Sequence, residues 1–195
     1  MIKSLIRKLL THQDYNTSAL KSFGKGSRLR MPLSVLRPEY ITIGEDTSIF
    51  ENSRLDCWDS YEHHKLFPKL QIGNRCDIGY NFSAHCTDEL IIGDDVLIAS
   101  YVLLTTQNHG MNVEDERSYQ RQPLYSSPIH IESGVWIGEK VTVLPGVTIG
   151  EKSIIGANSV VTKNVPPFCI AVGIPAKVIK KWDFDTHCWR NVKDK

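Results

Sequence analysis

His109 is the residue whose type and setting point most directly to chemistry. It follows the strand-like run 98–106 and opens a long non-repeating segment within Gln107-Asn108-His109-Gly110. An imidazole titrates near neutral pH, so it can take a proton from an alcohol that attacks a carbonyl, and general base catalysis of this kind is worth about 10²–10⁴-fold in rate. A single histidine at the start of a loop is also a common surface residue. The residue type alone leaves both roles open.

Residues 56–69 are polar and aromatic without periodicity, and Asp56 and Trp58 are the candidate binding residues among them. Carboxylates accept hydrogen bonds from sugar hydroxyls, and aromatic rings offer an apolar face to sugar rings. The same composition is equally typical of a folded surface loop. We therefore expect Asp56 and Trp58 either to contact a bound sugar or to be ordinary surface residues.

His85 is followed directly by Cys86, which raises a covalent route through a cysteine nucleophile. Adjacent residues on an extended strand point to opposite faces, so neighbours in sequence are not automatically a base and its nucleophile. We favour a direct attack of the alcohol on the carbonyl, without a covalent intermediate on the enzyme. The run Asn81-Phe82-Ser83-Ala84-His85 resembles the segment in which galactoside acetyltransferases carry an asparagine that faces the acceptor. That resemblance implies a contact of His85 with the acceptor or the oxyanion, and a surface histidine is the equal alternative.

The elements that must position these residues follow from a repeat of six residues. Branched aliphatic residues occupy one slot of six successive hexads: Ile131, Ile137, Val143, Ile149, Ile155 and Val161. Small or β-branched residues occupy the fifth slot of the same hexads: Val135, Val141, Val147, Ser153, Ser159 and Val165. A period of six fits neither an α-helix nor an ordinary strand. It predicts a triangular solenoid in which each hexad supplies one short strand and one corner.

The same register recurs less regularly upstream, with Ile-Gly pairs at Ile43, Ile72, Ile78 and Ile92, and its breaks indicate insertions. A long loop inside a compact repeat is uncommon and usually functional. We predict a mainly β chain with an extruded loop and short helical termini. Its expected parts are a helical or extended cap over 1–40, a β-helix over 41–165 with insertions at 56–69 and 109–128, and a tail over 166–195.

Composition narrows the functional classes. The 195 residues include 23 Lys and Arg against 22 Asp and Glu, and the net charge of +1 provides no global field for nucleic acid. Five irregularly spaced cysteines are typical of reduced thiols in a cytoplasmic protein. We see no signal peptide and no apolar run long enough to cross a membrane.

Residues 1–10 have the pattern of a short basic amphipathic helix. Such a helix can lie on an anionic membrane surface, which would place the protein at the inner face of the membrane. It can also cover the open end of the solenoid, where strand edges are unpaired, or pack on a neighbouring subunit. We favour the covering or packing role.

The repeat, the Asn-His-Gly turn at 108–110 and the Ile-Gly-Ala-Asn-Ser-Val-Val run at 155–161 resemble the hexapeptide-repeat acyltransferases, over about residues 41–180. The chain is similar to sugar O-acetyltransferases of the galactoside and maltose type and to O-antigen, colanic acid and virginiamycin acetyltransferases. The resemblance implies a left-handed parallel β-helix, a homotrimer with active sites between subunits, and direct transfer from acetyl-CoA. It maps the catalytic histidine onto His109 and implies an acceptor hydroxyl on a bacterial surface polysaccharide, such as O-antigen or capsule.

The resemblance also places the coenzyme A end in the C-terminal part of the chain. Gly156 and Ala157 would leave room for the pantetheine arm, and backbone N–H groups near Gly138 or Gly156 would bind the tetrahedral oxyanion. Trp136 would pack on the donor or fill a corner outside the prism. Cations at the end of the solenoid would meet the nucleotide phosphates, although isolated lysines are usually solvated surface. The candidate phosphate contacts, with a neighbouring hydroxyl, are Thr162, Lys163, Lys177 and Lys180.

Three alternative functions remain. N-acylation of an amino sugar would use the same scaffold and His109, since an amine needs less assistance from a base than an alcohol. A noncatalytic solenoid that binds partners through its flat faces is permitted by repeat architecture, although His109 and the lysine segment argue against it. A γ-type carbonic anhydrase needs three zinc-binding histidines, two of them five residues apart, and no histidine pair here has that spacing, so we expect no metal.

Overall fold

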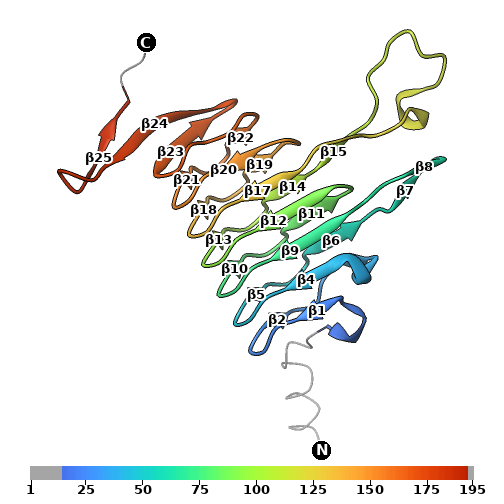
Figure 1. Ribbon diagram of the computed structural model, residues 1–195, viewed down its shortest axis with the longest axis horizontal. Coiled ribbons are helices and arrows are strands. Elements are labelled where there is room, and N and C mark those ends of the chain that lie inside the picture. Colours follow the sequence, from blue (N-terminus) through green and yellow to red (C-terminus); the bar gives the residue numbers. More distant parts are fainter. Residues whose placement is uncertain (1–14, 193–195) are drawn as a thin grey trace, which may run out of the picture.

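Residues 15–192 are described by the computed structural model, and the amphipathic segment predicted over 1–10 lies outside them. Most of the described chain winds in stacked coils of three short strands, one on each side of a triangular prism (Figure 1). Strands of successive coils pair in parallel, as Ile78 does with Ile49 on one side and Ile98 on the other. The described chain is therefore mainly β and forms the triangular solenoid of parallel strands that the period of six predicts. This architecture agrees with the left-handed parallel β-helix that the resemblance implies.

Three long sheets form the sides of the prism. The first sheet contains, in spatial order, β1 (Ser22–Phe23), β4 (Ile41–Ile43), β9 (Lys69–Ile72), β12 (Glu89–Ile92), β17 (Ile129–Ile131) and β20 (Thr148–Ile149). The second contains β2 (Arg28–Leu29), β5 (Ser48–Ile49), β10 (Asp77–Ile78), β13 (Leu97–Ile98), β18 (Trp136–Ile137), β21 (Ile154–Ile155), β23 (Cys169–Gly173), β24 (Ala176–Asp183) and β25 (Cys188–Asn191). The third contains β22 (Val160–Val161), β19 (Thr142–Val143), β14 (Leu103–Thr105), β11 (Ser83–Cys86), β6 (Arg54–Cys57) and β3 (Ser34–Leu36).

Both repeated slots point into the prism. Every aliphatic of the first slot over 131–161 is at most 1% exposed, and every residue of the fifth slot over 135–165 is at most 5% exposed. Burying one such aliphatic is worth about 1.5–3 kcal/mol, and over 131–165 these two slots supply the buried apolar residues of the core. The serines in the fifth slot have partners where the coils become irregular: Ser153 Oγ donates to Pro166 O at 2.7 Å, and Ser159 Oγ accepts from Gly173 N at 3.0 Å.

The solenoid extends beyond the predicted bounds at both ends. At the N-terminal end, Phe23, Leu29 and Val35 pair in register with Ile43, Ile49 and Leu55, so a complete coil lies within the segment predicted as a cap. Two short 3-10 helices flank that coil, η1 (Thr17–Ala19) and η2 (Pro38–Tyr40).

The prediction of a helical C-terminus is wrong for the described residues. β23 instead continues the solenoid beyond residue 165 by pairing in parallel with β21, and β24 and β25 extend the second sheet as antiparallel strands. The rings of Trp182 and Trp189 lie opposite each other on β24 and β25 with their centroids 5.2 Å apart, and such cross-strand aromatic pairs stabilise a sheet.

Two insertions leave the prism at the same corner, where the third sheet gives way to the first. We call this corner, made by residues 58–68, 87–88, 106–128, 144–147 and 162–164, the loop edge. One insertion forms the hairpin β7 (Ser60–Tyr61) and β8 (His64–Lys65). The other closes at its base through the antiparallel pair β15 (Gln107–Asn108) and β16 (Tyr125–Ser126), and it contains η3 (Tyr119–Arg121). Both project from one side of the solenoid in Figure 1.

Candidate active site

His109 stands where the long loop leaves the solenoid. It directly follows β15, and its side chain is exposed. Gly110 explains the turn that comes next, because a Cβ there would lie 2.6 Å from Cβ of Gln122 and any side chain would clash. The Asn-His-Gly sequence therefore lets the chain pass close to the far side of its own loop directly after the imidazole.

Gln122 anchors the loop from inside. It is 2% exposed, its Nε2 donates to Asn112 O at 2.9 Å and to Arg117 O at 3.2 Å, and its Oε1 accepts from Asn112 N at 3.0 Å. Below it, Thr106 Oγ1 accepts from Thr87 N at 2.8 Å, and Thr87 Oγ1 lies 2.8 Å from Ser126 Oγ. These hydrogen bonds hold both ends of the loop against the coil beneath. The backbone that carries His109 is therefore fixed in position.

Tyr61 of the other insertion reaches His109. Its Oη lies 3.4 Å from Nδ1 of His109, and the two ring centroids are 5.6 Å apart at an interplanar angle of 66°. The same hydroxyl donates to the backbone carbonyl of Gln120 in the long loop. The residues 56–69 had been interpreted as sugar-binding or surface residues, and this contact between the two insertions was not predicted.

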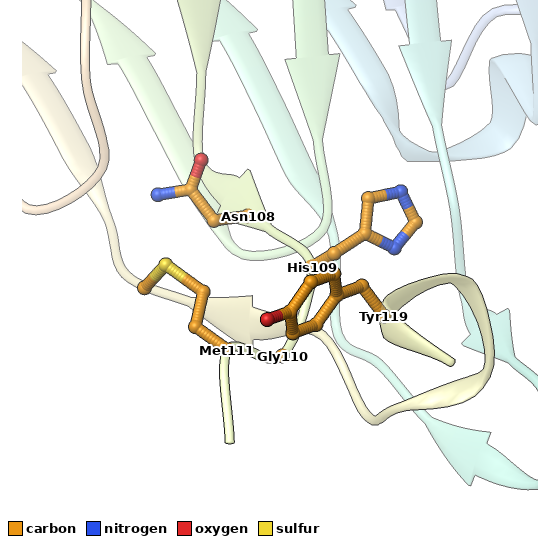
Figure 2. A pocket seen from close by; sticks show the side chains of 5 residues that line it. All are labelled: Asn108, His109, Gly110, Met111 and Tyr119. Carbon is orange, nitrogen blue, oxygen red and sulfur yellow. The ribbon is translucent and has the colours of Figure 1, made fainter. Parts of the chain in front are cut away.

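A surface pocket of about 520 Å³ adjoins the histidine and is lined by Asn108, His109, Gly110, Met111 and Tyr119. Figure 2 shows the side chains of Asn108 and Met111 on one side of the chain and the imidazole pointing to the other. An exposed imidazole beside a pocket of this size can meet an external hydroxyl group.

The three predicted acceptor residues come together on the outer face of the third sheet. Asp56 and His85 are register partners on β6 and β11, and Trp58 packs edge-on against His85 with centroids 5.5 Å apart. Burial, and secondarily the charge of Arg54, lowers the pKa of His85 below its ordinary value. Nε2 of His85 is buried and has no hydrogen-bond partner within the described chain. Because this nitrogen is enclosed by its surroundings, the cluster presents the half-buried ring of Trp58 to a ligand and not the nitrogen itself.

Asp56 has a different role from the predicted one. It is 2% exposed, and its carboxylate is engaged by Arg54 Nη2 at 2.9 Å and by Ser34 Oγ at 2.5 Å. A buried carboxylate with both oxygens engaged supports the sheet and holds Arg54, so it does not face an acceptor in this arrangement. The sequence analysis missed both partners: Arg54 lies two residues before Asp56, and Ser34 lies one coil below.

The covalent route through cysteine finds no support. Cys86 and Cys57 are register partners inside the core, and both are 0% exposed. The hydrogen bond between the two thiols and their burial hold the pKa of Cys57 far above its ordinary range. A thiol in this position cannot meet a substrate as a thiolate nucleophile. All five cysteines of the chain are free.

The glycines predicted for the donor site have another explanation. A Cβ on Gly138 would lie 2.7 Å from the backbone nitrogen of Ala157, and a Cβ on Gly156 would lie 2.6 Å from a methyl group of Val172. The neighbouring coil fills both spaces, so neither glycine leaves room for a pantetheine arm. Their own N–H groups donate to Ile155 O at 2.8 Å and Ala171 O at 2.9 Å and are therefore engaged, so an oxyanion donor near these glycines would be a neighbouring N–H group and stays a prediction. Ala157 alone of the three is exposed.

The other donor candidates lie in two places. Trp136, Ile154, Ile170 and Lys180 are aligned by register across the second sheet, and Trp136 lies outside the prism with 48% of its surface exposed. Lys177 pairs with Val172 at the end of β23, beside the corner that holds Gly156. Thr162 and Lys163 are exposed at the loop edge, two coils beyond His109. The candidate phosphate contacts of one chain are therefore divided: Thr162 and Lys163 lie at the loop edge, and Lys177 and Lys180 lie on β24.

Two further findings concern residues 15–192 only. No group of three or more His, Cys, Asp or Glu side chains is arranged there to hold a metal ion. No helix of that part of the chain has the length and apolar character needed to span a membrane.

Comparison with known proteins bears on this site. The family described as bacterial transferase hexapeptide (six repeats) matches residues 128–163. Galactoside O-acetyltransferase of Escherichia coli is 42% identical over 122 residues, which cover 59% of this chain and 59% of that protein. A putative lipopolysaccharide biosynthesis O-acetyl transferase of the same species is 44% identical over 108 residues, covering 52% of this chain and 55% of that protein. The matched part is less than two thirds of the length of either relative.

A solved structure extends the likeness to the whole described fold. The hexapeptide-repeat acetyltransferase of Vibrio cholerae, complexed with acetyl coenzyme A, matches with a TM-score of 0.53 and 25% identity, covering 100% of this chain and 80% of that one. The repeat, the parallel coils and the named relatives agree with the resemblance predicted from the sequence. The chain therefore contains a segment that matches the hexapeptide-repeat transferase family over residues 128–163, and its fold is similar to that of a hexapeptide-repeat acetyltransferase.

Proposed function

We propose that the chain is an acetyl-CoA-dependent O-acetyltransferase that modifies a sugar hydroxyl, with His109 as general base. The observation that carries the proposal is the exposed imidazole of His109 beside a pocket at the loop edge. The names of the two bacterial relatives support sugar O-acetylation, and a unit of a bacterial surface polysaccharide is the acceptor class that the second one favours. The complex of the Vibrio cholerae relative supports acetyl-CoA as the donor.

The proposed reaction is a direct transfer. His109 takes the proton of the acceptor hydroxyl while the oxygen attacks the thioester carbonyl, and the resulting tetrahedral intermediate collapses with cleavage of the carbon–sulfur bond. Coenzyme A leaves as the thiolate and receives the proton back from the imidazolium. An imidazole suits both transfers because its two protonation states are both accessible near neutral pH.

The third-sheet cluster supports an acceptor site next to this base. His85 and Thr105 are register partners on β11 and β14, and the chain reaches His109 four residues after Thr105. The half-buried ring of Trp58, which packs edge-on against His85, offers an apolar surface to a sugar ring there.

Donor binding favours a site shared between two copies of the chain. His109 lies at the loop edge, whereas Ala157 and Lys177 lie at the opposite corner, between the second and third sheets. One hexad spans up to about 20 Å at about 3.3 Å per residue, so a whole side of the prism separates them. We propose a homotrimer, in which His109 of one subunit faces Trp136, Ala157, Lys177 and Lys180 of the next.

The test is to incubate the protein with acetyl-CoA and a panel of sugars and bacterial glycan fragments, and to follow release of free thiol. The product is then treated with mild alkali, which removes an O-acetyl ester and leaves an N-acetyl amide. We expect an alkali-labile product on a hydroxyl acceptor. An alkali-stable product would replace the proposal by N-acylation of an amino sugar, and the failure to bind acetyl-CoA would refute the transferase function. The mass in solution, by light scattering, tests the trimer separately.

A further inference from the structure

We propose that Tyr61 is a positioning residue that holds the imidazole of His109 in the Nδ1–H tautomer and so directs the basic Nε2 toward the acceptor. The inference rests on the proposed function, because it assigns to Tyr61 an effect on the base of that reaction. It gives the hairpin β7–β8 a role distinct from sugar recognition.

The proton count at Tyr61 determines the tautomer. A phenol has one proton to donate, and a backbone carbonyl can only accept. Tyr61 Oη donates to the carbonyl of Gln120, so its proton is already in use. The second contact of the oxygen, 3.4 Å from His109 Nδ1, is therefore one in which the oxygen accepts and Nδ1 carries the hydrogen.

The tautomer has a direct chemical consequence. A neutral imidazole has one protonated nitrogen and one with a free lone pair, and the hydrogen bond made by the first decides which nitrogen can act as base. With the proton on Nδ1, the lone pair lies on Nε2, at the far end of the ring from Tyr61. The ring contact, with centroids 5.6 Å apart and an angle of 66°, restricts rotation of the imidazole at the same time.

The contact also joins two insertions that leave different coils. The hairpin leaves the coil of β6, the long loop leaves the coil of β14, and the coil of β11 lies between them. Tyr61 spans this gap and binds both the imidazole and the carbonyl of Gln120 on the returning arm of the loop. Because Tyr61 holds both arms, it fixes the position of the ring relative to the pocket as well as its protonation.

The experiment is to read the tautomer of His109 by ¹⁵N NMR of the imidazole nitrogens in the full chain without substrate. Tyr61→Phe keeps the ring contact and removes only the hydroxyl. Tyr80→Phe is the matched control, because Tyr80 is an exposed tyrosine whose ring packs on Phe50, away from the loop edge. We expect the Nδ1–H form in the wild type and in Tyr80→Phe, and a mixture enriched in the Nε2–H form in Tyr61→Phe.

Kinetics provide the second measurement. Tyr61→Phe should lower kcat about two- to tenfold, the factor that one ordinary hydrogen bond is worth, with KM for acetyl-CoA unchanged. An Nε2–H imidazole in the wild type, or the same tautomer in wild type and Tyr61→Phe, would overturn the inference. The failure of the proposed function is distinct, since it would appear as full activity in a His109 variant whatever the NMR spectrum shows.

Discussion

The coils of the prism and the loop edge are held together by different kinds of interaction. In the coils, apolar side chains such as Ile137 are completely buried and the backbone pairs with the coil on either side. At the loop edge, Gln122, Tyr61 and Thr106 hold the chain through hydrogen bonds of side chains, and His109 remains exposed. Stability and the proposed chemistry therefore depend on separate residues, and each can be altered with limited effect on the other.

The largest expected effect is on the coils. Ile137→Ala removes buried methyl groups from a site whose neighbours above and below are fixed, and such changes cost about 2–5 kcal/mol of unfolding free energy. The matched control is Val113→Ala in the long loop, where 82% of the side chain is exposed and the expected change is within about 0.5 kcal/mol. Denaturant unfolding measures both. Equal losses in the two variants would contradict the separation between coils and loop edge.

A smaller loss of stability is expected on the outer face of the third sheet. Arg54→Met leaves the buried carboxylate of Asp56 without its cationic partner, and an unmatched buried polar group costs about 1–3 kcal/mol. The double variant Arg54→Met with Asp56→Leu should recover part of this loss, because both charges are then absent. Unfolding of the two single variants and the double variant forms a double-mutant cycle, and a coupling energy near zero would refute the ion pair.

The smallest expected effect concerns pH. His85 has a lowered pKa in the folded chain, chiefly because of burial, so the unfolded chain binds its proton more readily. Stability is therefore lost as the pH falls through the ordinary histidine value of about 6.5 toward the folded pKa, and no such loss occurs above it. We expect the fall in Tm on acidification to be smaller in His85→Asn than in the wild type. An NMR titration with a His85 pKa at or above the ordinary value would contradict this explanation.

Much of the fold could be predicted from the sequence because the core has a local pattern. Hexads over 131–165 alternate aliphatic and small residues, and each of those side chains is buried. The first coil was missed although Phe23, Leu29 and Val35 keep the same spacing of six. No Ile-Gly pair accompanies them, and Pro38 interrupts the segment that follows. The interrupted pattern looks like an irregular cap when read alone.

The candidate site could be predicted less completely, for two physical reasons. A glycine required for coil stacking and a glycine that opens a donor groove look alike in sequence, so Gly138 and Gly156 were assigned to the donor although neighbouring coils fill their spaces. The contact between Tyr61 and His109 depends on two insertions that fold toward each other, and no local spacing encodes it. His109 itself could be singled out because it opens the longest break in the repeat.

The most direct test of the central claim compares two histidine variants in acetyl transfer from acetyl-CoA to the best acceptor found. His109→Asn removes the proposed base, and His187→Asn changes an exposed histidine in the turn between β24 and β25, where the backbone φ of 49° suits asparagine. We predict that His109→Asn lowers kcat by about 10²-fold or more while it still binds acetyl-CoA, and that His187→Asn keeps the wild-type rate. Full activity in His109→Asn would contradict the assignment of His109 as general base.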